Sequence, residues 1–348
     1  MRALVYRGPG RLEVEERDSP PLGPGEARVR VEAAGLCGTD VRIFSGQHRA
    51  YADVSDRVPG HEIVGRLVEV GPGAGPAPAV GTRVFVAPNF GCGACDFCRR
   101  GAENLCRTTQ GLGITRDGGF AEEVVVPAAA VRLGNVIALA DDQDPAVATL
   151  VEPLACVVRG QDKVALGAAD TVYVAGAGPV GLLHVALARA RGASRVVCAD
   201  RSPVRRAAAE RAGAEVTFDW STTDAVAEIE ELTDGRGVDV VVAAAPSHEL
   251  QAQSLRLAAP SGRVLLFAGL PKSRPTVELD TNEIHYKELL VTATTASTLH
   301  DCTEAARLLG GDLSGLGWLV TDTYDLDQAE AAAARAQDRS ALKVVVTP

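Results

Sequence analysis

The sequence predicts an α/β protein with two parts, a β-rich region followed by a doubly wound parallel sheet. Its 348 residues correspond to about two domains at ~150 residues each. From its start to about Val126, the chain consists of short apolar runs bounded by glycine and proline, a pattern that predicts strands joined by turns. Beyond Glu152, apolar runs alternate with helical patterns, which is typical of parallel βαβ units.

The β-rich region contains two clear strand patterns, at residues 28–31 and 83–86. Residues 70–81 hold too many glycines and prolines for either regular element, so we expect a surface loop between two strands there.

The second region predicts its elements in a regular order. Buried strands are expected at residues 171–175, 195–199, 238–244 and 263–268, and helices over residues 179–191 and about 204–212. Residues 342–346 again have the pattern of a strand.

The overall charge limits the possible partners. The formal net charge is −10, so the surface repels phosphate backbones and anionic membranes, and we expect neither nucleic acid nor membrane as a partner. The first residues lack the apolar core of a secretory signal, and no apolar run approaches the length of a membrane span. We therefore expect a cytoplasmic protein whose cysteines are thiols or metal ligands rather than disulfides.

Four cysteines follow the spacing C-x2-C-x2-C-x7-C: Cys92, Cys95, Cys98 and Cys106. Thiolates at such spacing can converge on one tetrahedral zinc ion, and four protein ligands leave no position for water or substrate. Four unbound thiols or disulfides are the alternatives, and an iron–sulfur cluster usually shows a shorter last gap followed by proline. The pattern therefore predicts a structural zinc site.

A second possible metal site combines Cys37, His61, Glu62 and the later Glu152. Each of them alone is uninformative, because a single cysteine or histidine is more often a packed or hydrogen-bonded residue. Together they supply thiolate, imidazole and carboxylate, which is the donor set that a catalytic zinc uses with one open position.

Residues 176–181 read GAGPVG between a predicted strand and a predicted helix. This matches the dinucleotide fingerprint G-x-G-x-x-G. Asp200 ends the next strand, 24 residues after Gly176, where a carboxylate binds the adenosine ribose and repels a 2′-phosphate. We expect NAD rather than NADP, although Arg201 could favour a phosphate. The residues expected at the cofactor are Gly176, Gly178, Pro179, Val180, Gly181, Asp200 and Arg201.

The chain resembles the zinc-dependent medium-chain alcohol dehydrogenases, within them the polyol (sorbitol-like) and threonine dehydrogenase branch. The residues that carry this resemblance are GLCGTD, PGHEIVG, the cysteine quartet, VEPLA, GAGPVG and Asp200. The resemblance implies a GroES-like catalytic domain of residues 1–155 and 290–348, with a zinc lobe at 91–107, and a Rossmann domain at 156–289. It also implies two zinc ions per chain, NAD, a small alcohol or carbonyl substrate, and a homodimer or homotetramer.

The resemblance assigns roles to individual residues. Cys37, His61 and Glu62 match the catalytic zinc ligands, and Glu152 matches a glutamate that approaches the metal directly or through water. Which of the two glutamates is the resting ligand stays open. Arg205 matches a basic residue on the adenosine side.

The resemblance also implies a hydride transfer from a zinc-activated secondary alcohol to NAD. Thr39 matches the hydroxyl that takes the substrate proton, and Asp40 matches a carboxylate that orients His61. Arg42 stands where many members have a histidine that passes the proton to solvent, and arginine cannot do so near neutral pH. The proton then leaves through water, through the nearby His48 or along the glutamate side.

Lys343 resembles a basic residue near the cofactor pyrophosphate. The substrate pocket should draw on residues 44–48, Phe90 and residues 294–300, and the sequence does not separate polyol, cyclitol, sugar and amino alcohol. Two rival interpretations are a zinc-independent quinone or enone reductase of the same superfamily and a non-enzymatic zinc-ribbon module.

Overall fold

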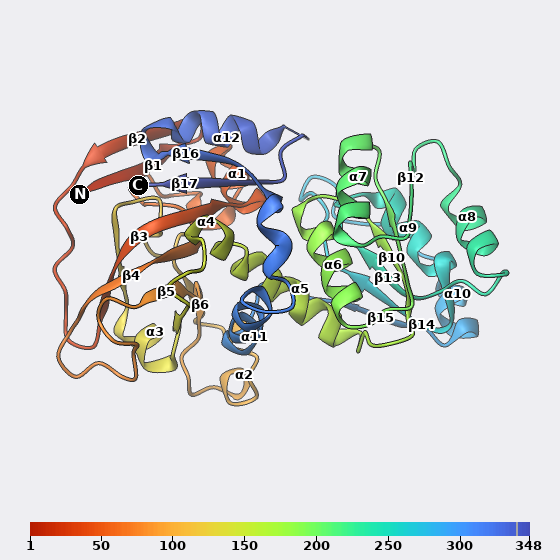
Figure 1. Ribbon diagram of the computed structural model, residues 1–348, viewed down its shortest axis with the longest axis horizontal. Helices are drawn as coiled ribbons and strands as arrows, with labels where there is room; N and C mark the ends of the chain where they lie inside the picture. Colours follow the sequence, from red (N-terminus) through yellow and green to blue (C-terminus); the bar gives the residue numbers. More distant parts are fainter. Residues whose placement is uncertain (339) are drawn as a thin grey trace. The chain divides into compact units, whose positions relative to one another are not determined.

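The computed structural model describes residues 1–338 and 340–348 (Figure 1). The chain divides into two compact units, one of Met1–Ala155 with Ala296–Pro348 and the other of Cys156–Thr295. The second boundary lies a few residues beyond the expected residue 290, because the strand at 290–293 pairs with the parallel sheet. No helix within the described ranges is both long and apolar enough to cross a membrane.

The first unit is built on a seven-stranded sheet whose order is β16-β17-β3-β4-β5-β9, with β8 paired to β3. Its strands, together with two small two-stranded sheets, are β1 (Arg2–Gly8), β2 (Arg11–Glu16), β3 (Ala27–Leu36), β4 (Glu62–Val70), β5 (Arg83–Val86), β6 (Asn89–Phe90), β7 (Gln110–Gly111), β8 (Glu123–Val126), β9 (Val136–Ala138), β16 (Val320–Asp325) and β17 (Lys343–Thr347). The blue strand β17 pairs antiparallel with the red-orange β3 (Figure 1), so the two ends of the chain share one sheet.

Helices of the first unit are short. They are α1 (Gly38–Phe44), α2 (Asp96–Arg99), α3 (Ala128–Leu133), α4 (Pro145–Ala148), α11 (Leu299–Leu309) and α12 (Ala329–Gln337). The helix α5 (Val151–Lys163) begins in this unit and ends in the second. The strand patterns at 28–31 and 83–86 are confirmed within β3 and β5, and the predicted loop at 70–81 joins β4 to β5.

The second unit is a six-stranded parallel sheet in the order β12-β11-β10-β13-β14-β15, which is the Rossmann order. Its strands are β10 (Thr171–Ala175), β11 (Arg195–Ala199), β12 (Val216–Phe218), β13 (Val238–Ala243), β14 (Ala258–Leu266) and β15 (Leu290–Ala293). Its helices are α6 (Pro179–Ala190), α7 (Pro203–Ala212), α8 (Ala225–Leu232), α9 (His248–Leu257) and α10 (Thr281–Lys287).

The central strand β10 is buried at every residue, because helices cover both faces of a parallel sheet and leave no polar side. Pro179 occupies the first turn of α6, where its missing N–H costs nothing. One predicted strand, 263–268, is displaced: β14 starts at Ala258, which pairs with Val238 across an irregular register, and ends at Leu266.

Candidate active site

Three predicted metal ligands meet at the junction of β3, β4 and α1. Cys37 precedes α1, and His61 precedes β4, whose first residue is Glu62. Gly35 pairs with Glu62 across the antiparallel strands, so the chain brings Cys37 past the start of β4. The sulfur, one imidazole nitrogen and one carboxylate oxygen all lie within 4.8 Å of one another, which is the donor set of a zinc site.

The polar atoms around these ligands fit a cation. Within the described residues, the buried Glu62 Oε1 has no hydrogen-bond partner, and a bound ion satisfies such a group. Burial lowers the pKa of His61, but the Asp40 carboxylate and the Cys37 sulfur together outweigh burial and leave that pKa well above its ordinary value. The site therefore stabilises positive charge where a metal would be held.

Asp40 has the position expected of a residue that orients His61. Its Oδ2 accepts a hydrogen bond from the Cys37 backbone N–H at 2.9 Å, and its Oδ1 lies 3.7 Å from His61 Nδ1. A carboxylate behind a ligating histidine fixes the ring and raises its basicity.

Lys343 is buried at this site beside Glu62. Its ammonium pairs with the Glu62 carboxylate and donates to the Leu36 carbonyl at 3.1 Å, and both side chains are almost completely buried. Burial lowers the pKa of Lys343, but Glu62, Cys37 and Glu152 together outweigh burial and leave that pKa raised. The closeness of the pair requires glycine at Gly35, because a Cβ there would collide with the Glu62 carboxylate and the Lys343 side chain.

Glu152 is buried near the start of α5 but is not a member of the three-ligand group. Its charge still acts on this region, since it contributes to raising the pKa values of Lys343 and Cys302.

Thr39 lies on the first turn of α1 and is half-buried. Arg42 donates a hydrogen bond from Nη2 to Thr39 Oγ1 at 3.2 Å, a contact that the i, i+3 spacing on a helix permits. His48 precedes a short 3₁₀ turn (Arg49–Tyr51), and its Nδ1 accepts from the Ala50 N–H at 3.3 Å. That bond gives His48 a local structural role.

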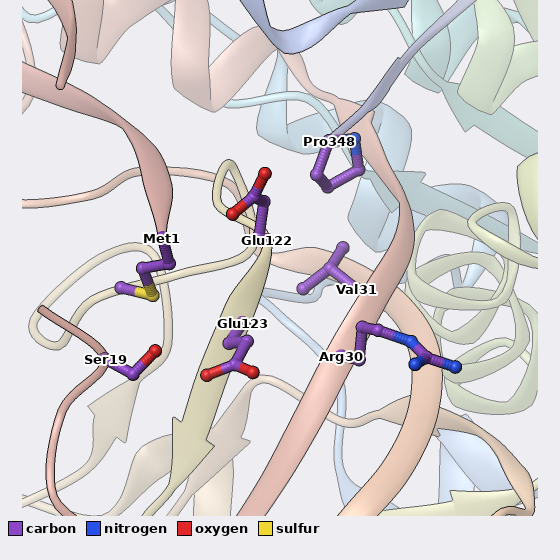
Figure 2. A pocket seen from close by; sticks show the side chains of 7 residues that line it. All are labelled: Met1, Ser19, Arg30, Val31, Glu122, Glu123 and Pro348. Carbon is purple, nitrogen blue, oxygen red and sulfur yellow. The ribbon is translucent and has the colours of Figure 1, made fainter. Parts of the chain in front are cut away.

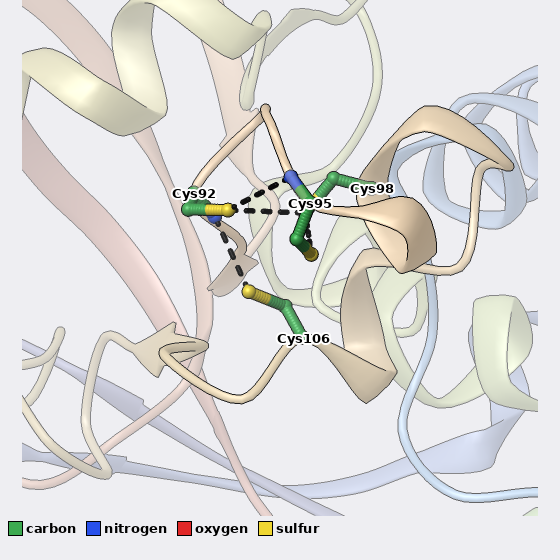
Figure 3. A group of neighbouring side chains, drawn as sticks. All are labelled: Cys92, Cys95, Cys98 and Cys106. Atoms are coloured by element: carbon green, nitrogen blue, oxygen red, sulfur yellow. Dashed lines mark hydrogen bonds between the residues drawn. The ribbon is translucent and has the colours of Figure 1, made fainter.

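The cysteine quartet forms one compact group in the loop around α2 (Figure 3), with its four sulfur atoms within 4.8 Å of one another. The Ala94 and Cys95 backbone amides donate to Cys92 Sγ at 3.4 and 3.3 Å, and these bonds lower the pKa of the Cys92 thiol. Burial instead raises the pKa of Cys98. Four sulfur atoms held at this spacing fit a structural zinc ion.

The lobe that carries the quartet is bonded to the start of α11. Glu103, between Cys98 and Cys106, accepts a hydrogen bond from the Leu299 backbone N–H at 2.6 Å. This hydrogen bond therefore attaches the lobe to the segment at 294–300, which we expect near the substrate.

Replacing Cys98 by serine should release about one zinc ion per chain and lower the melting temperature, because structural zinc contributes folding free energy directly. Metal analysis and thermal unfolding measure both effects. Cys156→Ser, outside the quartet, is the matched control and should keep the full zinc content. Unchanged zinc and melting temperature in Cys98→Ser would contradict a structural zinc site.

The glycine turn between β10 and α6 has the geometry that a pyrophosphate needs. Gly176 has a φ of +105°, and a Cβ on Gly181 would collide with the Gly176 carbonyl. Asp200 Oδ2 accepts a hydrogen bond from the Ala177 N–H at 2.9 Å, which ties the end of β11 to the turn. An Arg205 guanidinium nitrogen comes within 3.9 Å of the Cβ position of Gly178, so positive charge faces the turn.

One hollow of about 430 Å³ lies elsewhere on the first unit, lined by residues that include Arg30, Glu122, Glu123 and Pro348 (Figure 2). It contains none of the predicted site residues, so its size does not indicate the reaction site.

Two family models match the chain. The model described as an alcohol dehydrogenase GroES-like domain matches residues 23–134, and that described as a zinc-binding dehydrogenase matches residues 179–310. Among curated proteins, an L-threonine 3-dehydrogenase of Pyrococcus horikoshii is 35% identical over 93% of this chain and 91% of its own length. A sorbitol dehydrogenase of Halalkalibacterium halodurans is 31% identical over 100% of this chain and 99% of its own length.

Among solved structures, a zinc-binding dehydrogenase from Sinorhizobium meliloti bound to NADP has a TM-score of 0.89 and 34% identity. That match covers 100% of this chain and 99% of the other. The sequence resemblance is thereby confirmed: the chain belongs to the zinc-dependent medium-chain alcohol dehydrogenase family, in the branch of the threonine and polyol dehydrogenases.

Proposed function

We propose that this oxidoreductase transfers hydride between a polar secondary alcohol and NAD, with one catalytic and one structural zinc per chain. Membership of the family makes the chain a secondary-alcohol dehydrogenase; the cofactor choice, the two metal sites and the substrate class are the proposal. The observation that carries it is the group of Cys37, His61 and Glu62, with the Thr39 hydroxyl two residues from the cysteine.

Cys37, His61 and Glu62 would hold the catalytic zinc, which supplies Lewis-acid polarisation of the substrate oxygen when bound. Asp40 fixes the His61 ring from behind. Thr39 accepts the hydroxyl proton of the substrate on Oγ1 and releases its own proton outward. Because Arg42 donates to that same oxygen, it fixes the Thr39 rotamer.

Arg42 also bears on how the proton leaves. Arginine stays protonated near neutral pH and cannot accept a proton from Thr39. Its permanent charge favours the deprotonated state of a nearby oxygen. Since the His48 ring already accepts a backbone N–H, the proposed exit for the proton is water beside Thr39.

The proposed cofactor preference rests on Asp200. Its carboxylate accepts the Ala177 and Ser202 amides at 2.9 Å each, and each carboxylate oxygen retains a second acceptor position for a ribose hydroxyl. The negative charge repels the additional phosphate of NADP. The S. meliloti relative is bound to NADP, so the preference of this chain for NAD has to be measured directly.

Asp200→Ala should weaken NADH binding by about 1–3 kcal/mol, the range for losing charge-assisted hydrogen bonds, and should narrow the ratio of NADH to NADPH affinity. Fluorescence titration of both reduced nucleotides measures the change. Glu215→Ala, which removes an exposed carboxylate before the start of β12, is the control and should leave NADH affinity nearly unchanged. A wild-type enzyme that already prefers NADPH would overturn the assignment.

A panel of secondary alcohols, polyols, cyclitols, sugars and amino alcohols, scored by NADH formation, tests the proposed reaction. Metal analysis in the same preparation should give about two zinc ions per chain. One zinc or none, with activity on quinones or enones, would favour the zinc-independent reductase instead. Dehydrogenase family models match both the GroES-like part and the nucleotide-binding part of the chain. These matches argue against a non-enzymatic zinc-ribbon module.

A cytoplasmic homodimer or homotetramer completes the proposal. The edge strand β15 of the parallel sheet has one side without a partner strand in the described chain, and its Leu290 is 51% exposed. Exposed strand edges with apolar side chains favour association with another chain. Light scattering after gel filtration distinguishes dimer, tetramer and monomer.

A further inference from the structure

The ends of β11 and β12 place two pairs of residues side by side. Phe218 pairs with Ala199 in the parallel register, and the Asp200 N–H donates to the Phe218 carbonyl at 3.2 Å. Asp200 and Arg201 therefore follow one strand directly beside Asp219 and Trp220, which follow the next.

Asp200 and Arg201 are held in opposite directions. The Asp200 carboxylate is bonded to Ala177 in the glycine turn after β10. The Arg201 guanidinium lies over the Trp220 ring, 5.0 Å from its centroid. Because β11 lies between β10 and β12, the carboxylate is held toward the glycine turn and the cation away from it.

The other two arginines of this segment are fixed differently. Arg206 donates to the Asp200 and Arg201 carbonyls at 2.8 and 3.0 Å and lies 3.5 Å from Asp219 Oδ2. Arg205 lies near Gly178. Among the described residues, the Trp220 ring is in direct contact with the exposed Arg201 guanidinium. The Asp219 carboxylate also attracts that guanidinium electrostatically, on the same side as the ring.

We propose that Trp220 is a positioning residue for cofactor choice: by holding Arg201 on its ring, it keeps a cation away from the ribose 2′ position and leaves Asp200 to exclude NADP. This inference rests on the proposed function, because it concerns the same nucleotide site. Freed from the ring, Arg201 would pair with a 2′-phosphate through parallel N–H donors, as arginine does with phosphates. Trp220 therefore acts through Arg201 rather than by touching the cofactor.

The expected effect is modest and specific. An exposed cation–π contact is weak, so its loss should change the NADPH-to-NADH affinity ratio about two- to fivefold in favour of NADPH. Trp220→Leu removes the aromatic face, whereas Trp220→Phe keeps one and should retain the wild-type ratio within about twofold.

The experiment titrates NADH and NADPH into the full-length enzyme by nicotinamide fluorescence, with no alcohol present. Four variants are compared with the wild type: Trp220→Leu, Trp220→Phe, Arg201→Ala and the double variant Trp220→Leu/Arg201→Ala. Both affinities are measured on one preparation, so a partly unfolded fraction cancels in their ratio. Arg201→Ala leaves the core untouched and remains informative even if Trp220→Leu is unstable.

Trp220→Leu should raise the ratio, Arg201→Ala should leave it close to wild type, and the double variant should lose the rise seen with Trp220→Leu. A rise that persists without Arg201 would overturn the inference, as would a ratio that stays constant or falls in Trp220→Leu. A large fall in Arg201→Ala would also overturn it, because Arg201 would then already bind the phosphate. Wild-type enzyme that binds neither nucleotide would overturn the proposed function and this inference together.

Discussion

Thr39→Val should lower kcat by about 10²-fold or more, the scale at which a positioned proton-transfer group contributes. Valine is close to threonine in shape but has no hydroxyl to accept the substrate proton. It also removes the acceptor of the Arg42 hydrogen bond. Substrate binding at the metal site should persist, so the variant should lower kcat strongly and change KM little. A steady-state assay with an alcohol whose chemical step limits turnover measures this effect.

Thr39→Ser is the matched control, since it keeps the hydroxyl and should keep most of the rate. Arg42→His should be tolerated, because it places a titratable group where related enzymes carry one. His48→Ala should leave the pH profile of kcat unchanged, as its ring is bonded to the Ala50 N–H. Near-normal kcat in Thr39→Val would refute the relay through Thr39.

In the metal-free protein, Lys343→Met should lower the free energy of unfolding by about 3–5 kcal/mol, the cost of leaving one member of a buried ion pair alone. Glu62 is completely buried, and its carboxylate pairs with the Lys343 ammonium. Methionine preserves much of the side-chain volume, so the effect isolates the lost charge. Urea denaturation compares the variant with the wild type.

The double variant Glu62→Gln/Lys343→Met should recover much of that stability, because it removes both buried charges. The same set of proteins separates the two roles considered for Lys343. If Lys343 binds the cofactor, Lys343→Met should weaken NADH binding and leave the free energy of unfolding unchanged. If Lys343 serves the buried ion pair, the variant should lower the free energy of unfolding and leave NADH binding unchanged. Full stability of Lys343→Met in the zinc-loaded enzyme would show that the metal, rather than Lys343, neutralises Glu62.

The sequence predicted best the features that depend on adjacent residues. The β10–α6–β11 segment agrees within about one residue, because a continuous apolar run, a glycine turn and a proline in the first helical turn are all local signals. The cysteine quartet is equally local and lies together as expected.

Features that depend on distant pairing were harder to foresee. The Glu62–Lys343 pair joins β4 to β17, and no pattern in either strand specifies its partner. The strand β15 was placed in the wrong unit because an exposed edge strand buries few side chains and so has a weak apolar pattern. The Arg42–Thr39 bond could have been found from its i, i+3 spacing alone.

The interrupted first unit has a consequence for synthesis on the ribosome. Residues 156–295 are continuous in the chain, so the nucleotide-binding unit can fold as soon as it emerges. The first unit, although it starts earlier, lacks β16 and β17 until the ribosome has passed the second unit. Until then the last residues of β3, at 34–36, lack their β17 partner, and Glu62 has no ammonium beside it. The surroundings of Glu62 in the proposed metal centre can therefore be completed only after β17 has been synthesised.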